Sequence, residues 1–341
     1  MLFAKPTSKK STDLELFIGR QKSCHNPFIQ LAYDEVITGV LAGECRWRHP
    51  ADYALVRLQG PDAVDFLQRL CSQDVARIDP GRGLPAAFLD PKGKLIATCW
   101  LTRSEEAVWL ETTGPMAGPV VEMLDRYHFS EQLTIHRVTD WVCGEVLGAA
   151  APEVMGVGAG EVQALADGGL AFGGARNGLG WVRYHAPAEF FDAPPWAARQ
   201  LEEVTSDHAE CMRICAGIVA VGDDTERGTL ALEAALDDHV SVDKGCYTGQ
   251  EIVARIHTYG HLNRRLCLLV VDGAPDIELG TSLHETDEGD PVGRAMTSAP
   301  LPDGAGKVAL GYLPGDFQAA GTELRLGGAE GPRVVVASFG D

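Results

Sequence analysis

The 341-residue sequence predicts an α+β protein in which two related α+β subdomains precede a C-terminal antiparallel β-barrel. Three observations predict this fold. A chain of this length exceeds one ordinary hydrophobic core, so two or three domains are expected. An order of strand, short helix, hairpin and helix occurs twice, at a period of about 85 residues. From Arg265 onward, short strands alternate with loops rich in Gly, Pro and Asp, which is typical of small all-β domains.

The first copy of the repeated order starts at Tyr53. Apolar runs predict its strands, and apolar residues at helical spacing predict its first helix. The segment Asp90-Pro91-Lys92-Gly93 joins two of the strands, with Pro and Gly placed as a hairpin requires. The predicted elements are strands at 54–58, 84–89, 94–101 and 107–111 and helices at 63–70 and about 114–127.

The second copy is predicted from strands at 140–147, 169–172 and 179–184 and a helix at 187–204. Sequence identity between the copies is faint, and an unrelated α+β chain also yields such an order, so both explanations stay open. The predicted organisation is a polar extension at 1–28, a first α+β domain at 29–131 with 205–262, a second α+β domain at 132–204 and a barrel at 263–341.

Composition and charge exclude several classes of protein. Hydrophobic residues make up 45% of the chain and charged residues 23%, which argues against disorder. No apolar run reaches the roughly 18 residues of a membrane span, so no membrane partner is expected. The net charge of −19 would repel phosphates, so no direct nucleic-acid binding is expected. The N-terminus lacks the apolar segment of a secretory signal, so we expect a cytoplasmic protein, with the mitochondrial matrix as the alternative.

The nine cysteines do not form a disulfide or zinc pattern. Their number is odd, their spacing is wide and no C-x-x-C occurs, so most are predicted to be small core residues in a reducing compartment. His257 and His261 have the spacing of metal ligands on a helix, but no third ligand is nearby, so no metal site is predicted.

The segment Lys244-Gly245-Cys246-Tyr247-Thr248-Gly249-Gln250-Glu251 is predicted to carry the function. Thr248 and Glu251 have the spacing of a capping box, in which each side chain would bind the other's backbone N–H. Together with an apolar stripe, this predicts a helix from Gly249 to about Tyr259.

Cys246 would then lie just before the N-terminus of this helix. The helix end and the Lys244 ammonium would both favour the thiolate, which is the reactive form. Gly245 removes a side chain beside the sulfur, so another molecule can approach closely. A cysteine buried under the loop is an equally good interpretation of the sequence.

Charge is distributed unevenly around this segment. Residues 200–243 contain eleven Asp or Glu and only two cations, whereas residues 244–265 contain four cations and one acid. This pattern favours a bound anion such as a carboxylate or phosphate, and a solvated charged surface is the alternative.

The segment, followed by Ile252-Val253-Ala254-Arg255, resembles the signature of the YgfZ family, which is related to the glycine-cleavage T-protein (aminomethyltransferase). Further similarity to the family lies at residues 58–67, at the 90–94 hairpin, at Arg213 with Gly217, and at Glu233-Ala234. The resemblance covers roughly residues 30–341.

The resemblance implies two α+β subdomains and a barrel around a central channel that binds tetrahydrofolate. It implies a factor for assembly or repair of 4Fe–4S clusters in client enzymes, with an indirect effect on tRNA modification and with iron–sulfur assembly or client proteins as partners. It assigns catalysis to Cys246 and Lys244. The cofactor contacts expected from the matching positions are Arg213, Glu233, Tyr247, Gln250, Glu251 and Arg255, with Lys244 and Arg255 as candidates for the glutamate tail.

The sequence departs from the T-protein pattern at one functional place. An acidic pair follows the hairpin glycine in the T-protein, and this chain has Ala97 and Thr98 there. Without a carboxylate, the acid/base for aminomethyl transfer is missing, so a one-carbon transferase is the weaker alternative. A non-catalytic scaffold that docks a cluster carrier is a third hypothesis. The sequence leaves open whether Cys246 is a nucleophile, a cluster ligand or a redox switch.

Overall fold

The computed structural model describes residues 27–339 except for 51–52, 167, 261 and 286–289. Of the predicted polar extension, residues 1–26 lie outside the described residues, and 27–28 begin helix α2 (Pro27–Leu41). Within the described residues, no helix is long and apolar enough to cross a membrane.

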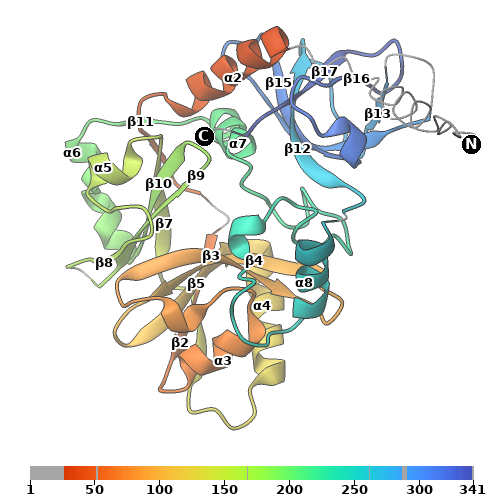
Figure 1. The fold of residues 1–341 in the computed structure, drawn as a ribbon. Helices are drawn as coiled ribbons and strands as arrows, with labels where there is room; N and C mark the ends of the chain where they lie inside the picture. The colour runs from red at the N-terminus through yellow and green to blue at the C-terminus, as the bar shows by residue number, and fades with distance from the viewer. Residues whose placement is uncertain (1–26, 51–52, 167, 261, 286–289, 340–341) are drawn as a thin grey trace, which may run out of the picture.

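The strands of the described chain form two sheets and a closed barrel (Figure 1). The first sheet has five strands in the order β3-β4-β5-β2-β6, and the second has six in the order β11-β1-β7-β10-β9-β8. Six antiparallel strands form the barrel in the order β12-β15-β14-β13-β16-β17. The predicted α+β fold with a C-terminal barrel is therefore confirmed.

The first sheet follows the predicted order of elements closely. Its elements are β2 (Tyr53–Gln59), α3 (Ala63–Leu70), η1 (Val75–Arg77), β3 (Arg82–Leu89), β4 (Leu95–Arg103), β5 (Ala107–Thr113), α4 (Gly114–Tyr127) and β6 (Thr134–Val138). Helix α3 lies below strands β3, β4 and β5 in Figure 1, with Phe66 and Leu67 buried in the core, and α4 packs against β2, β4 and β6. In the hairpin, Asp90 accepts from the backbone N–H groups of Lys92 and Lys94 at 2.8 and 2.9 Å.

The second sheet repeats only part of this order. Its elements are β1 (Arg46–Arg48), β7 (Val142–Leu147), α5 (Ala151–Met155), β8 (Val162–Ala164), β9 (Leu170–Arg176), β10 (Leu179–Ala186), η2 (Ala188–Asp192), α6 (Pro195–Ala198) and β11 (Glu202–Glu203). The predicted helix at 187–204 is wrong. Pro194 and Pro195 interrupt it, because proline lacks the N–H that a helix interior needs and disfavours helical backbone in the residue before it.

Two strands cross between the predicted domains. Strand β6 lies beyond the predicted boundary at residue 131 but pairs with β2 of the first sheet. Strand β1 precedes the first sheet in the chain but pairs with β7 and β11 of the second. The domain boundaries themselves stay predictions.

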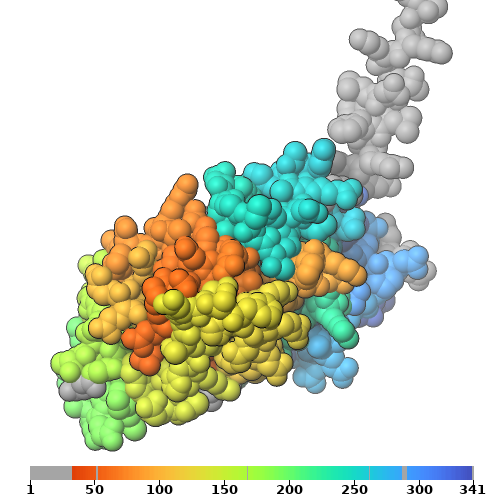
Figure 2. Space-filling view, turned by 90° about the horizontal axis from the view of Figure 1, so that it is seen from below, coloured from red at the N-terminus to blue at the C-terminus, as the bar shows by residue number. Residues whose placement is uncertain are grey.

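The remaining chain connects the sheets to the barrel. It contains α7 (Ser206–Cys215), η3 (Asp237–His239) and α8 (Gln250–Tyr259). The barrel consists of β12 (Arg265–Asp272), β13 (Ser282–His284), β14 (Gly293–Pro300), β15 (Gly306–Leu313), η4 (Gly315–Phe317), β16 (Glu323–Leu326) and β17 (Arg333–Ala337). One hydrophobic core includes residues of both sheets, α2, α7 and the barrel, so the parts pack as one unit. From below, the surface of the α8 region lies beside the orange surface of the first subdomain (Figure 2).

Candidate functional site

A central cavity lies between the first and second sheets. It is open to solvent on one side and has a volume of about 90 Å³. Its walls come from strands β2 to β5, from β9 and β10, from the loop after α7 and from η3. The lining residues are Tyr53, Pro85, Thr98, Cys99, Trp100, Glu111, Thr112, Thr113, Ala175, Arg176, Trp181, Arg183, Ile218, Val219, Asp238 and His239.

A buried ion-pair network joins the two sheets at this cavity. The Arg183 guanidinium donates to Glu111 at 2.7 Å and to Glu145 at 2.6 Å. Arg48 also donates to Glu145, at 2.7 Å, and His185 Nε2 lies 2.5 Å from Glu111. Glu111 belongs to β5 and Arg183 to β10, so the network holds the first sheet against the second.

The network fixes the charge of its two carboxylates. Burial alone would raise the pKa of Glu111, but the charges and hydrogen bonds of Arg183 and His185 outweigh it and lower the pKa to about 2. Arg183 and Arg48 lower the pKa of Glu145 in the same way. Both carboxylates are therefore ionised and bound near neutral pH, and neither is a free acid or base.

Aromatic rings form an apolar part of the cavity wall. The Arg183 guanidinium carbon lies 4.0 Å from the Tyr53 ring centroid and 5.0 Å from that of Trp181. Trp100 packs edge-to-face on Trp181 with centroids 5.6 Å apart. Rings of this kind suit a flat heteroaromatic ligand, which can stack on them.

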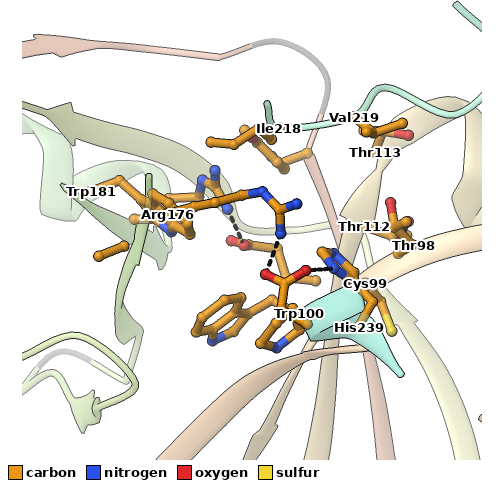
Figure 3. Close-up of a pocket in the computed structure, with 16 residues that line it drawn as sticks. Thr98, Cys99, Trp100, Thr112, Thr113, Arg176, Trp181, Ile218, Val219 and His239 are labelled. Carbon is orange, nitrogen blue, oxygen red and sulfur yellow. Dashed lines mark hydrogen bonds and ion pairs between the residues drawn. The ribbon is translucent and has the colours of Figure 1, made fainter. Parts of the chain in front are cut away.

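A second group of polar residues closes the cavity on the side of η3. Arg176 of β9 donates to the Asp238 carboxylate and also to the backbone carbonyls of Ala235 and Gly217. His239 Nδ1 lies 2.8 Å from the other Asp238 oxygen. In Figure 3, His239 lies with Thr98 and Cys99 on one side of the cavity, and Arg176 lies with Trp181 on the other.

The cysteine loop, residues 240–249, continues from η3 and is anchored on the first subdomain. The Lys244 ammonium donates to the carbonyls of Gln68, Cys71 and Gln73 at 2.7, 2.9 and 2.6 Å. Gln68 lies in the last turn of α3, Cys71 is its C-cap and Gln73 follows just beyond, so the ammonium lies at the helix C-terminus, where a cation is favoured. All three donors of the ammonium are thus used for anchoring, and partial burial lowers the pKa of Lys244.

At its other end the loop packs on the β3–β4 hairpin. Gly249 has φ +85° and lies so close to the hairpin that a Cβ would be 2.6 Å from the Asp90 carbonyl oxygen. A Cβ on Gly93 would likewise be 2.7 Å from Ile252 of α8. Both glycines are needed for this close approach.

The predicted capping box is wrong. Helix α8 begins at Gln250, with Gly249 as its N-cap and no side-chain cap. The left-handed Gly249 places Thr248 outside the helix, and the Gln250 side chain accepts from the Tyr247 backbone N–H at 3.1 Å instead. The end of the helix, with Gly260 at φ +65° as C-cap, agrees with the prediction.

Cys246 lies between the two anchored ends of the loop and is exposed. Eight cysteines belong to the part of the chain that the structure describes, all of them free, and among these only Cys246 is exposed. A Cβ on the neighbouring Gly245 would meet no atom within 4 Å, so the approach to the thiol is open. The geometry thus presents one accessible thiol on a fixed loop.

The other predicted site residues lie outside the central cavity. Arg213 is bound on both sides by Glu210 and Asp224 and contacts Thr297 of the barrel at 3.0 Å, so it ties α7 to β14. Glu233 pairs with Arg264 at 3.5 Å.

Arg255 lines an open pocket beside α8 together with Glu233, and no ion pair of Arg255 occurs within the described chain. The three other predicted residues lie along the cysteine loop and the start of α8. Tyr247 is buried, which raises its pKa to about 12, and its ring centroid lies 4.9 Å from the Lys244 ammonium. Gln250 closes the loop, as described above, and Glu251 is exposed.

The positions that match the acidic pair of the T-protein carry no carboxylate. Ala97 is fully buried in the core of the first sheet. Thr98 lines the cavity, and its backbone carbonyl accepts from Thr112 at 2.8 Å. The sequence-based prediction missed the cavity carboxylate Glu111, although a charged residue directly after the apolar run 107–110 was a usable signal.

Comparison with known proteins places the chain among related sequences and folds. Residues 52–178 match the GCVT N-terminal domain. The tRNA-modifying protein YgfZ of Serratia proteamaculans is 30% identical over 277 residues, which cover 74% of this chain and 80% of that protein. A putative chloroplastic transferase of Arabidopsis thaliana is 24% identical over 298 residues, or 81% of this chain and 66% of the relative. The crystal structure of the glycine cleavage system aminomethyltransferase T from Bartonella henselae has the same fold, with a TM-score of 0.76, 19% identity and coverage of 89% and 88%.

Proposed function

Because this chain belongs to the YgfZ family, we propose that it binds tetrahydrofolate and serves the assembly or repair of 4Fe–4S clusters in client enzymes, using Cys246. One observation carries the proposal. The exposed thiol lies on an anchored loop that continues directly from the wall of the central cavity. Ligand and thiol chemistry can therefore be coupled through a short, fixed stretch of chain.

The central cavity fits a folate. The rings of Tyr53, Trp100 and Trp181 line it and suit a pterin, whose pyrimidine ring is planar and can stack on them. Threonine and histidine side chains supply polar partners along one wall. When bound, tetrahydrofolate would supply the secondary amines that carry one-carbon units. The tail contacts predicted for Lys244 and Arg255 remain proposals, and the exposed, unpaired Arg255 is the better placed of the two for an anion.

The stretch between cavity and thiol is held at several points. Ser72 donates to the His239 carbonyl at 2.6 Å and accepts at its own carbonyl from the Ser241 N–H at 2.9 Å. Lys244 adds its three bonds to the end of α3. Such anchoring supports a thiol that meets partner proteins in a defined position. Its role as nucleophile, transient cluster ligand or redox switch is part of the proposal to be tested.

Folate-dependent aminomethyl transfer is the weaker alternative. It needs a carboxylate that can exchange a proton beside the reacting nitrogen. Ala97 and Thr98 offer none, and Glu111 is held ionised between Arg183 and His185. The residues of the cavity therefore favour a folate-binding factor over a transferase.

The effect on tRNA is proposed to be indirect. A net charge of −19 is unfavourable for binding a polyanion, whereas it does not hinder contact with proteins. The proposed partners are iron–sulfur assembly or client proteins, among them a cluster-dependent enzyme that thiomethylates tRNA.

A complementation experiment tests the proposal. In cells lacking this gene, the activity of 4Fe–4S enzymes and the content of thiomethylated tRNA would be measured after expression of wild-type protein, Cys246→Ser or the control Thr258→Ser on the exposed side of α8. We expect the wild type and the control to restore both quantities and Cys246→Ser to restore neither. Full restoration by Cys246→Ser would refute the role of the thiol, and unchanged cluster enzymes in the deletion cells would refute the cluster role.

A further inference from the structure

His239 presents a fixed imidazole to the central cavity. It belongs to η3, its backbone N–H donates to the Leu236 carbonyl at 3.1 Å, and its own carbonyl accepts from the fully buried Ser72 at 2.6 Å. Its ring is held by Asp238, which is in turn bound by Arg176. The side chain of His239 is only 13% exposed and forms part of the cavity wall (Figure 3).

The contact with Asp238 determines which ring nitrogen carries the proton. Arg176 and His239 together outweigh burial and hold the pKa of Asp238 below its ordinary value, so this carboxylate is ionised and can only accept. Nδ1 of His239 must therefore be the donor. In the neutral ring, Nε2 is then an acceptor. Within the described chain, Nε2 has no hydrogen-bond partner, so its lone pair is available to a ligand.

We propose that His239 Nε2 accepts a hydrogen bond from a ring N–H of the reduced pterin and thereby selects tetrahydrofolate over folic acid. This inference rests on the proposed folate site. The reduced ring carries N–H groups at N5 and N8. In folic acid the same two nitrogens carry no hydrogen and are acceptors, so they would face the Nε2 lone pair without a bond. A site built to accept from an N–H rejects the analogue that lacks it, because its own polar atom is left unpaired.

The charges around His239 keep the ring neutral. Burial lowers the pKa of His239, the Asp238 carboxylate acts in the opposite direction, and Arg176 adds to the lowering. Across the cavity, Glu111 and Arg183 are bound to each other. At neutral pH, Nε2 is thus an acceptor. Protonation converts it into a donor and removes the proposed bond, and because the pKa is lowered this happens only at a pH below the ordinary histidine value of about 6.5.

Two variants separate the acceptor from the structural role of the residue. In His239→Asn, the amide nitrogen can still donate to Asp238, but nothing replaces Nε2. In His239→Gln, the longer side chain can place an amide oxygen near the position of Nε2. Calorimetric titrations of the full chain with tetrahydrofolate, under reducing conditions without oxygen, and with folic acid give the preference for each protein. Thermal unfolding of each variant checks that it is folded.

We expect wild-type protein to bind tetrahydrofolate more tightly than folic acid. In His239→Asn this ratio of affinities should fall about ten-fold, which is the effect of losing one hydrogen bond. His239→Gln should keep most of the preference. The preference of the wild type should be constant near neutral pH and fall in the acid range, at a pH below the ordinary histidine pKa of about 6.5, with no such step in His239→Asn.

An unchanged preference in His239→Asn would overturn the inference while the folate site stands. If that variant does not fold, a wild-type preference that stays constant down to the lowest pH at which the protein is folded overturns it equally. Failure of the wild type to bind either folate would instead refute the proposed function on which the inference rests.

Discussion

Replacing Lys244 by Met tests whether this residue anchors the cysteine loop. The change keeps the aliphatic stem over the Tyr247 ring but removes the ammonium that donates to three carbonyls at 2.6 to 2.9 Å. At about 1 kcal/mol of net stabilisation for each hydrogen bond, the free energy of unfolding should fall by about 3 kcal/mol. Without its partner, the end of α3 should also exchange its amide hydrogens faster.

Urea denaturation and hydrogen exchange measure these effects. With a slope of about 3 kcal/mol per molar, the loss corresponds to a midpoint lower by about 1 M urea. Exchange should quicken in peptides covering 63–77. The matched control is Lys92→Met on the exposed hairpin, where no bond of the ammonium occurs within the described residues and no change is expected.

A loss below about 0.5 kcal/mol, as for an ordinary surface substitution, would refute the anchoring role of Lys244. If such a variant also showed slower alkylation of Cys246 by iodoacetamide, the sequence-based prediction that Lys244 activates the thiol would be supported instead.

Two further predictions concern Cys246 and Glu111. Cys246→Ser should change the free energy of unfolding by less than about 0.5 kcal/mol, because the side chain is exposed, and a loss of 3 kcal/mol or more in urea denaturation would indicate a packing role. Glu111→Gln should destabilise the protein by about 3 kcal/mol, since it leaves Arg183 buried without one of its carboxylates; a thermal shift within the error of the wild type would contradict this. Because the pKa of Glu111 is lowered on folding from 4.5 to about 2, its contribution is complete above pH 4.5 and lost as the pH falls toward 2. Acid titration of the wild type should show this loss of about 3 kcal/mol, and Glu111→Gln should lack it.

Local patterns predicted most of the fold. The helices at 63–70 and 114–127 and the 90–93 hairpin occur as expected, because their apolar spacing and turn residues agree with the tertiary structure. The predicted helix at 187–204 was wrong because two prolines interrupt it, although its apolar spacing is helical. The predicted capping box was wrong because Gly249 packs closely on the hairpin and has a left-handed backbone. Thr248 therefore lies outside the helix.

The site was predicted in part. The signature segment identified the exposed Cys246, but Lys244 was predicted to act on the thiol, and the structure places its ammonium on α3. The network of Glu111 and Arg183 was missed because its members are far apart in the sequence and meet only when the two sheets pack. A charged residue inside an apolar strand is the signal that indicates such a network before the structure is known.

The most direct test of the central claim is a calorimetric titration of the full chain with tetrahydrofolate, comparing wild-type protein with Thr113→Phe. Thr113 lines the cavity, and its side chain caps no helix, so a phenyl ring there should fill the site without breaking a bond. Thr258→Phe on the exposed side of α8 is the matched control. We expect saturable binding of one tetrahydrofolate by the wild type and the control, and loss of binding in Thr113→Phe. No binding by the wild type at about 1 mM ligand, which corresponds to an affinity weaker than about 4 kcal/mol, would contradict the claim, as would undiminished binding by Thr113→Phe.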